Sequence, residues 1–365
     1  MSVNYASGLS PYANKGVCGL PELCDSEETL SRKITSLVDL LRTSKYTVVH
    51  TGAGISTPSG IPDFRGPKGV WTLEKQGKSP ETSVSFEEAL PSTGHMALVA
   101  LERAGFINYL ITQNIDGLHL RSGFPINRMS ILHGDMFLES CDLCNSIYVR
   151  ASSPVPTMGR HFTGFKCTRV KAQGRPCRGK LRDTILDWED ELPYPDYSLA
   201  VRESRKACLH VCLGTSLQIF PAAGLPFQST SRCSRKRKRS PDATTGNCKC
   251  EEILKADDPL QAPKVVIVNL QPTKMDSRAT FCLHAPIDRV LSEVCAKLNV
   301  PVPTLMKPSQ KFEPNIVFRS RHSSQLESCP QHIFWHPANE QSPLITSASA
   351  LPLRPKDELK YHEDP

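Results

Sequence analysis

Residues 46–66 read YTVVHTGAGISTPSGIPDFRG, and this stretch decides the predicted fold. Its first five residues, Tyr46 to His50, have the character of a short buried strand. Gly52 and Gly54 follow directly, so the backbone can approach a pyrophosphate and offer N–H groups to it. A strand that runs into such a turn indicates a sheet that binds a dinucleotide.

The loop departs from the usual dinucleotide fingerprint after Gly54. That fingerprint places a third glycine at position 57, where this chain has Thr57-Pro58, and the next glycine is Gly60. Because proline prevents an uninterrupted helix start, residues 60–67 are expected to continue as a loop, with a flap at 64–65 that covers a ligand. A plain strand-to-helix turn is the alternative. A dehydrogenase is the competing interpretation of the fold, and the missing glycine and the flap argue against it.

Three more apolar, β-branched runs alternate with helical patterns along the chain. They lie at 107–111, 208–213 and 265–268, and each ends in a polar or glycine-containing loop. An amphipathic helix is predicted after a Ser26 cap, and further helices are predicted around 96–101 and 290–298. The predicted fold class is α/β, a Rossmann-like parallel sheet with helices on both faces. Ligands of such sheets bind at the carboxyl ends of the strands.

Composition divides the chain into segments. Residues 1–26 are expected to form an N-terminal extension and residues 27–300 a catalytic domain. This domain holds a cysteine-rich module at about 139–180 and a charged insertion at about 228–262. Residues 301–365 are rich in Pro and Ser and are expected to be disordered.

The chain has fourteen cysteines, which raise the question of its redox compartment, and a net charge of +7, which favours an acidic partner near one segment. The N-terminus lacks the features of a signal peptide, so a reducing compartment is expected, and no apolar run is long enough for a membrane span. A basic cluster runs from Arg232 to Arg239. It is either a solvated charge run, a nuclear import signal or a contact for nucleic-acid phosphates.

The cysteine-rich module has a pattern of metal ligands. Cys141 and Cys144 have the spacing of a zinc knuckle, and Cys167 with Cys177 can complete a tetrahedral site. Four thiolates leave no open position for water, so one Zn²⁺ here would be structural. Four unlinked thiols are the alternative, since the second pair is nine residues apart.

Five motifs together resemble the sirtuin family in order and separation. The start of the chain, Thr184-Ile-Leu-Asp-Trp-Glu-Asp190 and Asn269-Leu-Gln-Pro-Thr-Lys274 resemble its nuclear, chromatin-associated class IV. The five motifs span roughly residues 27–300: Gly52 to Arg65, Gln113-Asn-Ile-Asp-Gly117, His133-Gly134, Gly214-Thr-Ser216 and Val268-Asn-Leu270.

The resemblance implies an NAD-dependent protein-lysine deacylase. Such an enzyme would act on acylated histone tails and other nuclear proteins, and would release nicotinamide and O-acyl-ADP-ribose with NAD as co-substrate. Residence in the nucleus and contact with chromatin or DNA are expected from the same resemblance and from the basic segments. A mono-ADP-ribosyltransferase and a non-catalytic, NAD-sensing chromatin module remain alternatives.

The resemblance also assigns roles to residues. His133 matches the base, which suits a histidine because its ordinary pKa is near the working pH; taken alone, it would be a core or turn residue. Asn114 and Asp116 match residues that hold the nicotinamide ribose and the carboxamide pocket, with an Asx-turn as the alternative. The further expected NAD contacts are Ala53, Thr57, Phe64, Arg65, Trp71, Gln113, Gly214, Ser216, Asn269, Gln271 and Ile287.

Overall fold

A computed structural model of the chain describes residues 9–80, 84–150, 154–170, 174–228 and 262–304. The basic cluster at 232–239, nearly all of the charged insertion and most of the Pro/Ser-rich tail lie outside the described residues. Among the helices of the described part, none has the length and apolarity needed to cross a bilayer.

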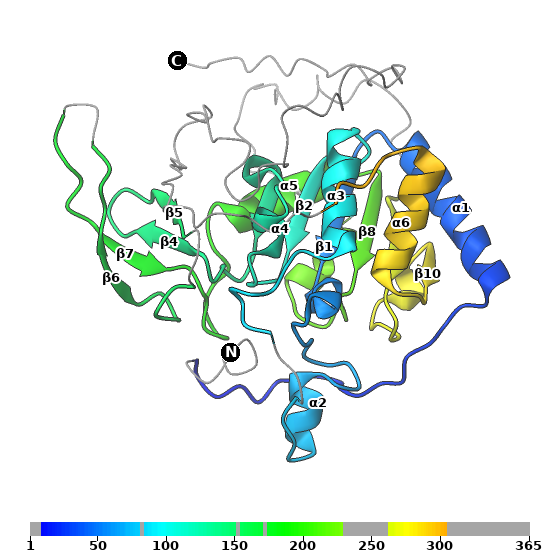
Figure 1. Cartoon of the computed structure of the whole chain (residues 1–365), viewed down its shortest axis with the longest axis horizontal. Helices are drawn as coiled ribbons and strands as arrows, with labels where there is room; N and C mark the ends of the chain where they lie inside the picture. The colour runs from blue at the N-terminus through cyan, green and yellow to red at the C-terminus, as the bar shows by residue number, and fades with distance from the viewer. Residues whose placement is uncertain (1–8, 81–83, 151–153, 171–173, 229–261, 305–365) are drawn as a thin grey trace, which may run out of the picture.

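A six-stranded, all-parallel sheet lies at the centre of the molecule (Figure 1). Four of its strands, β1, β2, β8 and β9, arise from the four predicted runs. The other two, β3 and β10, have three residues each, too short to leave a pattern in the sequence. The strands, in the spatial order β10-β9-β8-β1-β2-β3, are Phe281–Leu283, Lys264–Val268, Leu209–Leu213, Thr47–Thr51, Tyr109–Thr112 and Met129–Ile131.

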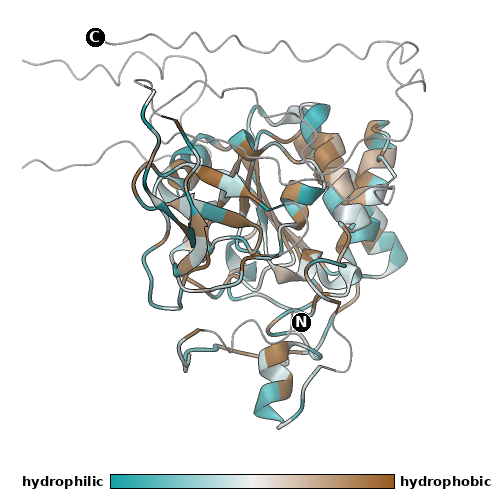
Figure 2. Ribbon diagram, turned by 60° about the vertical axis from the view of Figure 1, so that its left-hand side comes forward, coloured by the Kyte–Doolittle hydropathy of each residue, from teal (hydrophilic) through white to brown (hydrophobic). Residues whose placement is uncertain are grey.

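Helices cover both faces of this sheet, as predicted. On one face α3 (Thr93–Arg103) and α6 (Ile287–Leu298) pack together, and α1 (Glu27–Thr43) packs against α6. Along β1, Val49 faces these helices, whereas Val48 faces α5 (Asp196–Lys206) on the other side. Hydrophobic residues accordingly gather in the sheet and on the inner sides of the helices (Figure 2).

The first helix shows how local sequence fixes an element. The Ser26 side chain accepts a hydrogen bond from the Thr29 N–H, and Glu27 and Glu28 lie in the first turn, where the helix dipole favours negative charge. Its apolar residues recur every three or four positions and are buried: Leu30, Ile34, Leu37, Val38 and Leu41.

A second, antiparallel sheet forms a small module beside the first (Figure 1). Two further helices are short, α2 (Val70–Lys75), which lies at the lower edge of the molecule in Figure 1, and α4 (Leu118–Arg121). The module's strands, in the order β5-β4-β7-β6, are Ile147–Val149, Leu138–Cys141, Lys180–Asp183 and Phe162–Lys166.

Candidate active site and cysteine centre

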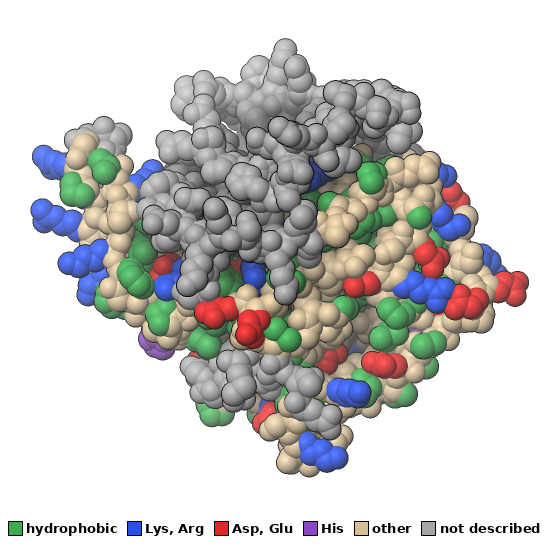
Figure 3. Space-filling model, in the orientation of Figure 1, with side chains coloured by type: hydrophobic (Ala, Val, Ile, Leu, Met, Phe, Trp, Pro, Cys, Tyr) green, Lys and Arg blue, Asp and Glu red, His purple; other side chains and the backbone are tan. Residues whose placement is uncertain are grey.

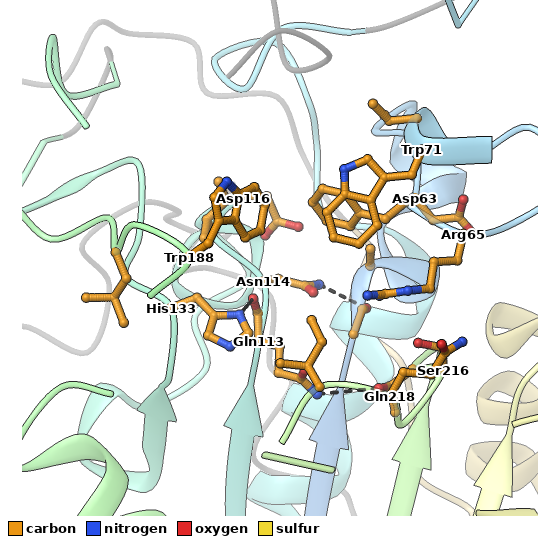
Figure 4. A pocket seen from close by; sticks show the side chains of 18 of the residues that line it. Asp63, Arg65, Trp71, Gln113, Asn114, Asp116, His133, Trp188, Ser216 and Gln218 are labelled. Atoms are coloured by element: carbon orange, nitrogen blue, oxygen red, sulfur yellow. Dashed lines mark hydrogen bonds between the residues drawn. The ribbon is translucent and has the colours of Figure 1, made fainter. Parts of the chain in front are cut away.

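A cavity of about 560 Å³ opens at the carboxyl ends of β1, β2, β8 and β9. From β1 the chain first adds strands on one side, β2 and β3, and later on the other side, β8, β9 and β10. The cavity lies at this switch point between β1 and β8, where open α/β sheets bind ligands. Most of the site residues expected from the sequence line it: Ala53, Phe64, Arg65, Trp71, Gln113, Asn114, Asp116, His133, Gly214, Ser216, Asn269 and Gln271. Figure 4 labels seven of them: Arg65, Trp71, Gln113, Asn114, Asp116, His133 and Ser216.

Two expected NAD contacts are not among the lining residues. The Thr57 hydroxyl donates to the Gly54 carbonyl at 3.1 Å, within the turn itself. Ile287 is buried at the start of α6. Their contacts with NAD stay predictions.

The glycines of the first turn are required by backbone packing as well as by any ligand. The chain passes from β1 through two short 3₁₀ turns, Ala53–Ile55 and Thr57–Ser59, in place of a continuous helix. The Gly54 N–H donates to the Gly214 carbonyl at 2.9 Å, and a Cβ on Gly54 would lie 2.8 Å from the Gly214 Cα. The turns after β1 and β8 therefore meet backbone to backbone, which only glycine permits.

His133 has a geometry that suits a proton acceptor. Its Nδ1 lies 3.0 Å from the Gln113 carbonyl oxygen. Because a carbonyl can only accept, this bond assigns the proton to Nδ1 and leaves Nε2 with its lone pair. Burial lowers the pKa of His133 below its ordinary value. The ring is therefore a neutral base at neutral pH.

Asn114 and Asp116 form one network with the glycine turn. The Asn114 Nδ2 donates to the Gly52 carbonyl at 3.1 Å and to the Ser56 hydroxyl at 3.3 Å. The Ser56 hydroxyl donates to the Asp116 carboxyl at 2.6 Å, and the Leu118 N–H donates to its other oxygen at 2.9 Å. Burial raises the pKa of Asp116. Both side chains are held in fixed positions before any ligand arrives.

The expected flap is ordered by aromatic contacts. The rings of Phe64 and Trp71 lie 4.8 Å apart, and the Arg65 guanidinium lies 4.5 Å from the centre of the Trp71 ring. Figure 4 shows Arg65 and Trp71 across the cavity from His133. The Arg65 Nε donates to the Lys15 carbonyl at 2.8 Å. The predicted contact of Arg65 with phosphate stays a prediction.

The segment from residue 9 to 25 is a part of the site that sequence reasoning missed. It runs along the edge of the molecule past α2 (Figure 1), and Leu9 and Tyr12 line the cavity. The Gln218 side chain accepts from the Val17 N–H at 2.8 Å and donates to the Val17 carbonyl at 3.0 Å. An extended segment that is held by such long-range contacts has no periodic apolar pattern. The only signal in the sequence was that the segment follows the first residues of the chain, which resemble the family.

The loop after β7 was quoted for the resemblance but was not assigned to the site. Trp188 lines the cavity and stacks on Tyr12 with ring centres 4.9 Å apart. The Leu186 N–H donates to the His133 carbonyl at 3.2 Å. This loop thus joins the N-terminal segment to the histidine.

The four predicted metal ligands come together in the small module. Their sulfur atoms all lie within 4.8 Å of one another, with 3.7 Å between Cys141 and Cys177 and 3.5 Å between Cys144 and Cys167. Tetrahedral Zn²⁺ with bonds of about 2.3 Å places its sulfur ligands about 3.8 Å apart. The group fits one structural zinc ion.

Comparisons with known proteins agree with the fold and the site. The model of the Sir2 family matches residues 78–221. The NAD-dependent protein deacetylase Sirt6 of Drosophila melanogaster is 44% identical over 311 residues, which cover 85% of this chain and 89% of that protein. The chain belongs to the sirtuin family.

Other relatives place this sirtuin within its family. The NAD-dependent protein deacetylase SRT1 of Arabidopsis thaliana is 44% identical over 84% of this chain and 58% of that protein. The NAD-dependent protein deacetylase sirtuin-7 of Bos taurus is 36% identical over 77% of this chain and 64% of that protein. These relatives and the Drosophila Sirt6 confirm the expected resemblance to the sirtuin family, with similarity to Sirt6 and to sirtuin-7.

Proposed function

We propose that this sirtuin is an NAD-dependent protein-lysine deacylase that releases nicotinamide and O-acyl-ADP-ribose. The observation that carries the proposal is a neutral His133, partly buried in the same cavity as Asn114 and the Gly52–Gly54 turn. The names of the relatives, which are NAD-dependent protein deacetylases, support it. We further propose acylated histone tails and other nuclear proteins as its substrates, on the resemblance to the nuclear class of the family.

In this proposal each residue has a defined task. NAD supplies a ribose carbon that the acyl oxygen attacks as nicotinamide leaves. The His133 Nε2 accepts a proton from a ribose hydroxyl, and the Gln113 carbonyl stabilises the imidazolium that forms. Asn114 and Asp116 hold the nicotinamide ribose and the carboxamide, and Phe64 shields the sugar from water. The glycine turn lines the cavity and would bring its backbone close to the pyrophosphate.

The proposal also covers organisation and location. Residues 27–300 would be the catalytic domain, with one zinc ion on Cys141, Cys144, Cys167 and Cys177 that stabilises the module without entering the chemistry. Residence in the nucleus and chromatin or DNA contact rest on the resemblance to class IV and on the basic cluster at 232–239.

A single assay tests the proposed activity. The protein is incubated with NAD and an acetyl-lysine histone peptide, and nicotinamide and deacetylated peptide are quantified together. We expect both to appear in equal amounts, and His133→Tyr to reduce both at least 100-fold because a general base contributes about 10²–10⁴-fold. The matched variant His161→Tyr changes an exposed histidine outside the cavity and should retain activity.

Two outcomes would contradict the proposal. Transfer of labelled ADP-ribose to protein without peptide deacetylation would identify a mono-ADP-ribosyltransferase instead. NAD binding without either reaction would identify a non-catalytic sensor.

A further inference from the structure

Asp288, in the first turn of α6, is a charged residue that the proposed mechanism does not use. Acidic and basic side chains are interspersed over α1 and α6 (Figure 3), and the next residue, Arg289, forms ion pairs with glutamates of both helices. In the described part of the chain no ion pair involves Asp288. Its carboxylate instead faces the start of α3, where Oδ1 accepts from the Gly94 N–H at 2.9 Å and from the Ser92 hydroxyl at 3.1 Å.

Two helices thus begin at one carboxylate. Ser92 is the N-cap of α3, whereas α6 begins after Pro286, which supplies no side-chain cap. The positive ends of both helix dipoles lie beside Asp288, so a negative charge is favourable there. The helices can approach this closely because residue 94 is glycine, since a Cβ on Gly94 would lie 2.7 Å from the Asp288 Oδ1. The carboxylate therefore fixes the start of α6 against the start of α3.

The same junction reaches the glycine turn in two ways. First, α6 packs against the 3₁₀ turn Ala53–Ile55, and Ile55 is buried in the core cluster to which α6 contributes. Second, the Ser92 hydroxyl lies 3.3 Å from the Ile55 carbonyl oxygen, so its single proton has both the carboxylate and the turn as acceptors. A change at Asp288 therefore affects the position of α6 and the hydrogen bonding of the turn.

We propose that Asp288 is a positioning residue for NAD. By fixing the start of α6 against α3 and the glycine turn, it sets the distance between that turn and Ile287, the expected NAD contact beside it. The inference rests on the proposed function and adds a residue that does not line the cavity. Its effect falls on NAD binding and not on proton transfer, because His133 follows β3, two strands away from β1.

The test measures KM for NAD, KM for an acetyl-lysine peptide and kcat in Asp288→Ala and Asp288→Asn. We expect Asp288→Ala to raise KM for NAD roughly 10-fold and to leave kcat and the peptide KM within about two-fold, because a charged acceptor is lost away from the reacting groups. Asp288→Asn keeps an oxygen for the Gly94 N–H and should raise KM for NAD only about three-fold, since a neutral acceptor forms the weaker bond. Amide exchange in residues 53–56 should also be faster in Asp288→Ala.

Ser26→Ala is the matched control for stability, since it removes the N-cap of α1, a helix that packs against α6 without lining the cavity. Its KM for NAD should stay at the parent value. An unchanged KM for NAD in Asp288→Ala would overturn the inference, and so would equal changes in kcat and the peptide KM. An equal rise in Ser26→Ala would overturn it too, because lost stability would then be the cause. If the parent does not deacetylate the peptide, the proposed function fails, and the inference falls only if amide exchange in residues 53–56 is unchanged in Asp288→Ala.

Discussion

The six-stranded and the four-stranded sheets lie side by side but are stabilised differently. The six-stranded sheet is packed between helices, and its main cluster of buried residues draws on α1, α3 and α6. The small module has its own cluster of five buried residues, the cysteines Cys141, Cys167 and Cys177 with Tyr148 and Leu181, whereas Leu138 and Val149 of its strands pack into the main cluster. On β6, four of the five residues are exposed.

This difference teaches where the stability of each part resides. Apolar burial contributes roughly 25 cal/mol per Å², so a sheet covered on both faces can be stable without a ligand. A module with so few apolar residues cannot offset its conformational entropy in that way. We infer that metal binding supplies the free energy of folding that the module's apolar core lacks. The module should therefore unfold without the six-stranded sheet when the metal is removed.

Metal removal should have the largest effect and should fall on the module alone. Structural zinc sites contribute about 10–16 kcal/mol of binding free energy. We expect Cys144→Ser, or a strong chelator with verified zinc loss, to abolish amide-exchange protection in residues 138–183 and to leave β1, β2 and β8 protected. Hydrogen exchange read by mass spectrometry measures this.

Cys208→Ser is the matched control, because Cys208 is exposed and outside the cysteine centre. Cys208→Ser should leave the amide-exchange protection of both sheets unchanged. Uniform loss of protection in both sheets after zinc removal would show that they form one cooperative unit and that the comparison is wrong.

The same contrast explains which parts of the fold the sequence could predict. The strands of the parallel sheet are continuous apolar runs, because burial on both faces demands them, so β1, β2, β8 and β9 were predicted. The strands of the module follow no such rule. β6 reads Phe-Thr-Gly-Phe-Lys, and its pairing with β7 is irregular. Only the cysteines identified that region as a module, because their spacing is that of metal ligands.

The junction of the two parts should be the next most sensitive point. Gly134 follows the histidine with φ of +85°, and a Cβ there would lie 2.0 Å from the Thr184 carbonyl oxygen. Because that neighbour is backbone, it cannot give way. We expect Gly134→Ala to lower the free energy of unfolding by roughly 4–5 kcal/mol and to impair activity.

Gly77→Ala is the control for this junction. Gly77 also has a positive φ, +68°, but a Cβ there would meet nothing within 4 Å. It should cost only about 1 kcal/mol, the backbone component alone. Chemical denaturation measures both variants, and equal losses would show that crowding at Thr184 contributes nothing.

The stability of the sheet near the site should depend on pH through Asp135. Burial, with a smaller contribution from Asp116, raises the pKa of Asp135 to about 7. Since an unfolded aspartate ionises near its ordinary value of about 3.9, the folded protein loses stability as pH rises from about 4 to about 7. Asp135→Asn keeps the acceptor for the Phe137 N–H but cannot ionise.

We therefore expect Asp135→Asn to match the parent near pH 4 and to exceed it above pH 7, by at most a few kcal/mol. Thermal unfolding between pH 4.5 and 8.5 measures the difference. Asp39→Asn, on the exposed face of α1, should follow the parent throughout. A difference that is constant with pH would remove ionisation of Asp135 as its cause.

For the site, the limits of prediction lie in contacts between distant segments. The strand-end residues Asn114 and Ser216 could be predicted because a parallel sheet brings its carboxyl ends to one edge. His133 follows β3, which leaves no pattern in the sequence, so only the resemblance to the family identified it. Tyr12 and Trp188 could not, since they meet across 176 positions of sequence and obey no local periodicity. The N-terminal segment belongs to the cavity through such contacts.

The smallest expected effect concerns that segment, which bridges the two parts of the molecule. Gln218→Ala removes both hydrogen bonds to Val17 and should cost about 1–2 kcal/mol locally. Faster amide exchange in residues 15–20 and a KM for NAD raised several-fold are expected, because Arg65 is held by the same segment. Gln76→Ala, at the exposed end of α2, serves as the control. If exchange accelerates while KM for NAD is unchanged, the segment covers the cavity without shaping it, and only the sheet edge defines the NAD site.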